Sequence, residues 1–207
     1  MKKLRVNDIF YTIQGEGAHA GEAAIFIRLA GCNLSCSFCD TAYETFREMD
    51  VSDILPAFPP NTCKTIVWTG GEPALQLTYE IIKYFKSRGY FQAIETNGSV
   101  VVPYGLDYVS CSPKVPIPIL LLSLQHYESI GEFRYLVGLD EMDDSIVPPR
   151  IDLLPKAEHY YVSPLFVGNA HEKLDLDKMN LQLAIDWVKA NPDWKLTIQQ
   201  HKIWNIR

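Results

Sequence analysis

Short apolar runs rich in β-forming residues recur along the chain and predict the strands of a sheet. The run AAIFIRLA, residues 23–30, is almost wholly apolar, a pattern typical of a strand covered on both faces. Its one charge, Arg28, requires an anionic partner. Comparable runs predict further strands at 65–69, 92–96, 108–111, 133–137, 160–162 and 196–199.

Helical periodicity lies between some of these strands. One apolar stripe covers 77–85 and stops at Gly89. Another runs from Met179 through Leu183 and stops before Pro192. Strands that alternate with helices predict an α/β fold with a mainly parallel sheet.

Polar or Gly/Pro-rich segments follow several of the predicted strands. Because the carboxyl ends of parallel strands meet at one edge of a sheet, we expect these segments to form one site. They are a cysteine-rich loop after 23–30, GGEP at 70–73, NG at 97–98, SPK at 112–114 and SP at 163–164.

The composition indicates one globular domain spanning residues 1–207. Of the 207 residues, 47% are hydrophobic and 12% aromatic, which allows a sizeable core. A formal net charge of −6 argues against a nucleic-acid partner and favours a small substrate. No apolar stretch is long enough to cross a membrane, and Asn7 and Asp8 interrupt the N-terminal segment before a signal sequence could form. The acidic segment 138–156 is expected to be a solvated loop.

Three of the five cysteines have the C-x3-C-x2-C spacing of a metal site with an open coordination position. Cys32, Cys36 and Cys39 suit one small cluster better than a disulfide framework. A fourth cysteine ligand is lacking, which is typical of a catalytic centre. Cys63 and Cys111 are interpreted as small buried hydrophobic residues. This cysteine usage indicates a reducing, cytoplasmic setting.

The TGGEP segment, residues 69–73, is a second motif with features of a ligand-binding loop. Its adjacent glycines, Gly70 and Gly71, let the backbone approach a ligand closely, and Glu72 is available to a cation such as an amino group. Taken alone, the cysteines also fit a zinc knuckle completed by His19, or a loop of free thiols.

The cysteine triad after one strand and GGEP after the next resemble the radical S-adenosylmethionine (SAM) superfamily. The resemblance implies a partial, modified (β/α) barrel of the radical SAM type. It also implies a [4Fe–4S] cluster held by the three cysteines, with SAM on the open iron. Gly71 and Glu72 would contact the amino group of SAM, and Phe38, Cys39 and Asp40 would lie near its adenine.

Several further segments occur together in one subfamily. They are TIQGEG at 12–17, FIRLAGCN at 26–33, CDT at 39–41, TGGEP at 69–73, ETNG at 95–98 and SPK at 112–114. On these segments the chain resembles the 7-carboxy-7-deazaguanine synthase family of the queuosine and deazapurine pathway. The family implies the substrate 6-carboxy-5,6,7,8-tetrahydropterin.

The family resemblance also implies which residues bind this substrate. Arg28 offers a planar fork for the substrate carboxylate. The alternative is a salt bridge between Arg28 and a buried acid such as Glu95. The glycine-rich loop and two strand-end hydroxyl groups would read the pterin ring, and the implied residues are Ile13, Gln14, Gly15, Glu16, Thr69 and Thr96.

The resemblance extends to a second metal and to further SAM contacts. Thr41 would be a ligand to Mg²⁺, which prefers hard oxygen atoms. From the sequence alone, Thr41 would be interpreted as a helix cap. Ser112, Lys114, Ser163 and Phe166 would contact SAM.

The implied activity converts the carboxypterin to 7-carboxy-7-deazaguanine with loss of ammonia. One-electron cleavage of SAM would give a 5′-deoxyadenosyl radical that abstracts hydrogen from C6 before ring contraction, and the hydrogen would be returned so that SAM is reused. The expected partners are an electron donor such as flavodoxin or ferredoxin, and a second copy in a homodimer. Two alternatives remain: an activase that makes a glycyl radical on a partner enzyme, and a non-catalytic zinc or iron–sulfur module.

Overall fold

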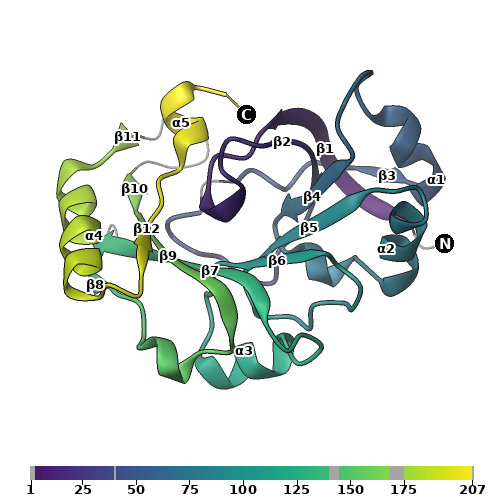
Figure 1. The fold of residues 1–207 in the computed structure, drawn as a ribbon. Coiled ribbons are helices and arrows are strands. Elements are labelled where there is room, and N and C mark those ends of the chain that lie inside the picture. Colours follow the sequence, from purple (N-terminus) through teal and green to yellow (C-terminus); the bar gives the residue numbers. More distant parts are fainter. Residues whose placement is uncertain (1–2, 40, 140–144, 168–174, 207) are drawn as a thin grey trace.

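The structure is a computed structural model that describes residues 3–39, 41–139, 145–167 and 175–206. Ten of the described strands form one curved sheet (Figure 1). They are β1 (Leu4–Ile13), β2 (Ala23–Leu29), β3 (Arg47–Met49), β4 (Thr65–Gly70), β5 (Phe91–Thr96), β6 (Tyr108–Cys111), β7 (Ile130–Leu139), β8 (Ser145–Ile146), β9 (Ala157–Pro164) and β12 (Lys195–Leu196). A separate pair contains β10 (Phe166–Val167) and β11 (Asp175–Leu176).

The strand order is β12-β9-β7-β6-β5-β4-β2-β1-β3, with β8 paired to β7 outside this path. Every neighbouring pair from β12 to β2 is parallel, whereas the β2–β1 and β1–β3 pairs at one edge are antiparallel. Among the described residues the edge strands β12 and β3 do not pair, so the sheet is an arc. This confirms the expected α/β fold with a partial barrel and a mainly parallel sheet.

Helices lie along the outer side of the arc, and the chain ends with a short helix near its open side (Figure 1). None of the helices in the described ranges is long and apolar enough to cross a membrane. The helices are α1 (Val51–Ile54), α2 (Tyr79–Lys86), α3 (Ile117–Ser123), α4 (Lys178–Ala190) and α5 (Gln200–Trp204). Single 3-10 turns are η1 (Gly17–His19), η2 (Leu55–Ala57), η3 (Pro73–Leu75) and η4 (Ile151–Leu153).

The main core lies between the sheet and the outer helices. Ile81, Ile82 and Phe85 of α2 are buried there, and the Phe85 ring packs against Trp68 of β4 at 5.4 Å. This confirms the predicted stripe on α2. The chain turns after the helix at Gly89, which has a φ of 78°.

Two predicted elements are wrong in detail. The strand expected at 196–199 is only Lys195–Leu196, because Thr197 already turns toward the N-terminal loop and accepts a hydrogen bond from Gly17 N. On α4, Met179 and Leu183 are exposed, whereas Asn180 faces the sheet and donates to the Leu165 carbonyl at 3.1 Å. The polar asparagine therefore occupies a position that periodicity assigns to an apolar side chain.

Other strands and helices of the structure were not predicted from the sequence. β1 contains Thr12 and Ile13, which were expected to lie in a loop. Helix α3 tolerates Pro118 because the proline stands in the first turn, where no backbone N–H is needed. In the segment 138–156, the structure has β8 and η4, and the acidic residues 140–144 lie outside the described residues.

Alternate residues of strand β7 face the outer core and the inner cavities. Successive strand residues point to opposite sides. Phe133 is fully buried in the outer core, whereas Glu132, Arg134 and Leu136 line cavities on the inner side. The inner side of the arc is therefore polar where the loops meet.

Candidate active site

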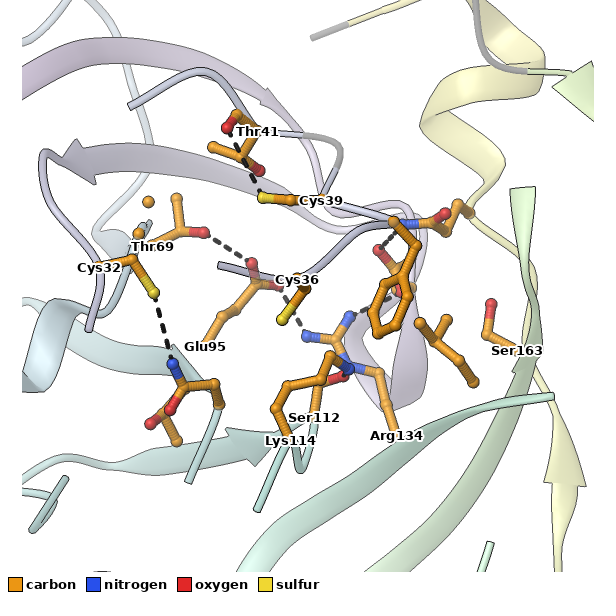
Figure 2. A pocket seen from close by; sticks show the side chains of 18 of the residues that line it. Cys32, Cys36, Cys39, Thr41, Thr69, Glu95, Ser112, Lys114, Arg134 and Ser163 are labelled. Atoms are coloured by element: carbon orange, nitrogen blue, oxygen red, sulfur yellow. Dashed lines mark hydrogen bonds and ion pairs between the residues drawn. The ribbon is translucent and has the colours of Figure 1, made fainter. Parts of the chain in front are cut away.

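A cavity of about 220 Å³ opens at the carboxyl ends of the parallel strands (Figure 2). Loops after β2, β4, β5, β6 and β9 contribute to its wall, as expected for a parallel α/β sheet. The sequence-predicted residues that line it are Glu16, Cys32, Cys36, Phe38, Cys39, Thr41, Thr69, Gly71, Thr96, Ser112, Lys114, Ser163 and Phe166. Asp40 lies outside the described residues.

The three cysteines of the triad come from the irregular loop after β2 and line this one cavity. Leu34 N and Asn97 Nδ2 donate to Cys32 Sγ at 3.4 and 3.6 Å, and Cys39 Sγ donates to the Thr41 carbonyl at 3.7 Å. Burial raises the pKa of Cys36, while the charge of Lys114 opposes this shift. Within the described residues, no three His, Cys, Asp or Glu side chains are drawn together as a metal-binding group.

The thiol groups nevertheless have the composition that an iron–sulfur cluster requires. Three soft sulfur donors from one loop face a shared cavity, and a fourth cysteine ligand is absent from the lining of that cavity in the described chain. Backbone and amide N–H groups already point at Cys32 Sγ, and such donors stabilise a thiolate ligand. The residues therefore fit a cluster with one open iron.

The Gly70–Gly71 pair packs directly on the start of the cysteine loop. Gly71 N donates to the Leu29 carbonyl at 3.1 Å, and Glu72 N donates to the Gly31 carbonyl at 3.0 Å. Gly70 has a φ of 127°, and a Cβ atom on Gly71 would collide with the Gly31 carbonyl oxygen. Glycine is therefore required for the two loops to meet.

Glu72 has a different environment from the expected one. Its side chain is fully buried and accepts hydrogen bonds from Ala74 N, Thr96 Oγ1 and Asn97 N at 3.0, 2.9 and 2.7 Å. Burial raises the pKa of this carboxyl, and the three donors oppose the shift. The carboxylate ties the β4 loop to the β5 loop rather than standing free for a cation, and its contact with SAM stays a prediction.

Elsewhere in the lining of this cavity, Lys114 donates to Ser112 Oγ at 2.9 Å and lies 5.5 Å from the centre of the Phe38 ring. Ser163 is buried, and its Oγ has no hydrogen-bond partner among the described residues. A buried hydroxyl group without a partner is costly, so a polar ligand in this cavity would satisfy it.

A second cavity of about 280 Å³ adjoins the first. Both are lined by Thr41, Thr69 and Glu95, so Thr41 stands at their boundary. The second cavity adds the remaining residues expected to bind a substrate: Ile13, Gln14, Gly15 and Arg28.

Arg28 is directed toward this second cavity without an ion-pair partner in the described part of the chain. Its guanidinium carbon lies 5.3 Å from the centre of the Phe10 ring, and its Nε atom is buried with no hydrogen-bond acceptor. Glu95 is paired with Arg134 instead, at 2.9 Å. The alternative of an Arg28–Glu95 salt bridge is therefore wrong, and Arg28 is available for an anionic group of a ligand.

Several residues of the site were missed by sequence reasoning. Glu132 and Arg134 on β7 are buried and form an ionic cluster with the partly buried Glu16 and Glu95. Their signal was two charges at alternate positions of an apolar strand, the same signal that marked Arg28. The C-terminal segment also contributes, since Gln199 Nε2 donates to Glu16 Oε1 at 3.1 Å.

Comparison with known proteins agrees with this geometry. A family model described as the Radical SAM superfamily matches residues 26–147. A 7-carboxy-7-deazaguanine synthase from Bacteroides thetaiotaomicron is 35% identical over 203 residues, which cover 98% of each chain. One from Haemophilus influenzae is 35% identical over 212 residues, covering 98% of this chain and 94% of that protein.

A solved structure shows the same fold. The crystal structure of QueE from Escherichia coli has a TM-score of 0.70 to this chain at 22% identity, and the match covers 95% of this chain and 93% of that one. The open α/β barrel with a cysteine loop at its carboxyl edge thus defines a radical SAM protein, a class that implies a [4Fe–4S] cluster and SAM. Within this class, the chain belongs to the 7-carboxy-7-deazaguanine synthase family.

Proposed function

We propose that this chain, as one radical SAM domain, converts 6-carboxy-5,6,7,8-tetrahydropterin to 7-carboxy-7-deazaguanine with loss of ammonia. The observation that carries the proposal is the pair of adjoining cavities, one next to the cysteine loop and one next to a partly buried arginine that has no ion-pair partner in the described chain. The shared name of its full-length relatives supports the same activity.

In this proposal the first cavity takes the cluster and SAM. Cys32, Cys36 and Cys39 would hold the cluster, and when bound it supplies with SAM a carbon radical that removes hydrogen from the substrate. The Gly71 backbone would lie against the methionine part of SAM. The hydroxyl of Ser163 and the ammonium of Lys114 would hydrogen-bond its polar atoms.

The second cavity would take the carboxypterin. Arg28 would bind the carboxylate with two parallel hydrogen bonds and leave the ring directed toward the first cavity. Thr41, at the boundary, would contribute its hydroxyl to a Mg²⁺ ion that also meets the carboxylate. Gln14 and Thr69 would contact the ring edge, and the surrounding loops would exclude water from the reacting carbon.

The two alternatives account for less of the molecule. A glycyl-radical activase would use the cysteine loop but has no need for a second cavity with an arginine at its wall. A non-catalytic zinc module would leave both cavities unexplained. The relatives' shared name also favours the synthase.

The proposal includes partners and a setting. An electron donor such as flavodoxin or ferredoxin would supply the electron, and two copies would form a homodimer. All five cysteines are free, which supports a reducing, cytoplasmic setting. Sedimentation of the reconstituted protein would test the dimer, and turnover with each reduced donor would test the electron source.

The activity is tested by anaerobic reconstitution with iron and sulfide, followed by incubation with SAM, a reductant, Mg²⁺ and the carboxypterin. The expected result is 7-carboxy-7-deazaguanine, detected by mass spectrometry, together with an equimolar amount of ammonia. Cleavage of SAM without consumption of the carboxypterin would contradict the substrate assignment. A protein that binds zinc and leaves SAM intact would favour the non-catalytic module.

A further inference from the structure

Arg134 stands at the centre of the ionic cluster and lines the first cavity (Figure 2). It is 6% exposed. Its Nη2 atom lies 2.9 Å from Glu95 Oε1, its Nη1 atom 3.2 Å from Glu16 Oε2, and its Nε atom 3.1 Å from Glu132 Oε1. The contact with Glu132 is ionic only, because Nε is not aligned for a hydrogen bond. One guanidinium thus joins carboxylates from the loop after β1, from β5 and from β7.

Two of these carboxylates in turn accept hydrogen bonds from the N-terminal loop and from β4. Glu95 accepts hydrogen bonds from Gln14 Nε2 at 3.0 Å and from Thr69 Oγ1 at 2.9 Å. Glu132 accepts one from Ala18 N at 2.8 Å, just beyond the glycine-rich loop. The ion pairs of Arg134 therefore connect directly to the residues proposed to contact the pterin ring.

The charge on Glu95 decides how these neighbours present their hydrogen-bonding groups. An ionised carboxylate only accepts hydrogen bonds, so the Thr69 hydroxyl must donate to it and turns its lone pairs toward the cavity. Gln14 must likewise direct its amide nitrogen at Glu95, and its Oε1 atom accepts from Glu16 N at 3.2 Å. One N–H and one lone pair of Gln14 remain for a ligand.

Arg134 has the electrostatic effect that this arrangement needs. Burial alone would raise the pKa of Glu95, but the charge and hydrogen bond of Arg134, together with the hydrogen bonds from Gln14 and Thr69, outweigh it, and the pKa is lowered overall. Burial opposes the charge on Arg134 as well, and the surrounding carboxylates reverse that effect and raise its pKa. The Glu95 side chain is only 24% exposed, so its ionised form would be destabilised without this cation.

We propose that Arg134 is a positioning residue that, through its ion pairs with Glu95 and Glu16, fixes the donor and acceptor pattern that Gln14 and Thr69 present to the pterin ring. The inference rests on the proposed function. It makes the Arg134–Glu95 pair a determinant of substrate orientation and affinity, while the ion pairs of Arg134 involve no residue of the cysteine loop.

The test compares Arg134→Gln, Arg134→Lys and a control, Arg150→Gln, in the anaerobically reconstituted protein. Arg150 also pairs with a carboxylate, Asp152 at 2.7 Å, but on the exposed surface. For Arg134→Gln we expect the KM for carboxypterin to rise at least about tenfold, with the iron–sulfur absorbance retained. SAM cleavage without pterin is measured beside it and should fall by a smaller factor than carboxypterin turnover. In Arg134→Lys the KM should rise less, because lysine restores the positive charge but not the planar guanidinium group. The control should match wild type.

A double variant, Arg134→Gln with Glu95→Gln, covers the case in which the single variant does not fold. It has the same net charge in the cluster as the wild type and removes the Glu95 carboxylate together with its cation. Glu16 and Glu132 still lose Arg134, but Glu132 keeps the hydrogen bonds donated by Ala18 N, Tyr108 and Ser110. We still expect a raised KM, because an amide at position 95 no longer dictates the orientation of Gln14 and Thr69. A wild-type KM in either variant would overturn the inference.

The remaining outcomes also separate the two proposals. Loss of iron–sulfur absorbance and SAM cleavage in both variants would indicate a purely structural role and overturn the inference alone. Absence of carboxypterin turnover by the wild-type protein would overturn the proposed function, and this inference with it.

Discussion

Replacing Arg28 by Ala should separate catalysis from stability. In the described residues the Arg28 side chain makes no ion pair, and its main contact is with the face of Phe10 at 5.3 Å. Its removal therefore costs about 1–2 kcal/mol of folding free energy, the range of one cation–π contact. The carboxylate of the substrate, however, loses its charge-assisted partner.

The loss of that partner should cost about 2–5 kcal/mol in transition-state binding. This corresponds to a decrease in kcat/KM of about 30-fold to about 5,000-fold. Arg28→Lys should recover little of it, since a point charge cannot reproduce two parallel hydrogen bonds. Cleavage of SAM without pterin should persist in both variants, because it requires only the first cavity.

The assay measures carboxypterin turnover and uncoupled 5′-deoxyadenosine formation side by side, with urea unfolding as the stability measurement. Arg88→Ala is the matched control, because Arg88 also covers an aromatic ring, that of Tyr84 at 3.6 Å, but on the exposed surface. A folded Arg28→Ala protein with wild-type turnover would refute the assignment of Arg28 to the substrate carboxylate.

Further substitutions test the cluster ligands, the metal site, the glycine loop and the core. Replacing any one of the three cluster cysteines by Ala should abolish the iron–sulfur absorbance, whereas Cys63→Ala should retain it; the reverse result would refute the ligand set. Thr41→Ala should raise the Mg²⁺ concentration needed for half-maximal turnover and leave SAM binding, measured by equilibrium dialysis, unchanged. Gly71→Ala should destabilise the protein by about 1–3 kcal/mol and weaken SAM binding, because its methyl group meets the Gly31 carbonyl. Phe85→Ala should cost about 3–5 kcal/mol in urea unfolding with little effect on the affinity for SAM.

The parts of the site that depend on local spacing could be predicted from the sequence. The cysteine loop and the two glycines after β4 are each contiguous, and the parallel sheet brings them to one edge. Strands β2, β4, β5 and β6 were also predicted within a residue or so, because their apolar runs are bounded by polar or glycine-containing segments.

The sequence could not predict which charged residues pair with each other when they lie far apart along the chain. Glu95 is paired with Arg134 rather than with Arg28, although both arginines lie on apolar strands, because strand order and register decide which guanidinium reaches the carboxylate. The three hydrogen bonds that Glu72 accepts depend in the same way on how the β5 loop packs against it. Such choices follow from tertiary packing, for which periodicity carries no signal.

In the proposed function, the hydrogen at C6 of the carboxypterin is removed at the junction of the two cavities. The most direct measurement uses carboxypterin labelled with deuterium at C6, incubated anaerobically with the reconstituted protein and unlabelled SAM. The account predicts 7-carboxy-7-deazaguanine as the product and deuterium in the recovered SAM, since the abstracted hydrogen enters its 5′ carbon and SAM is reused. Product formation with no deuterium in SAM or in 5′-deoxyadenosine would contradict it.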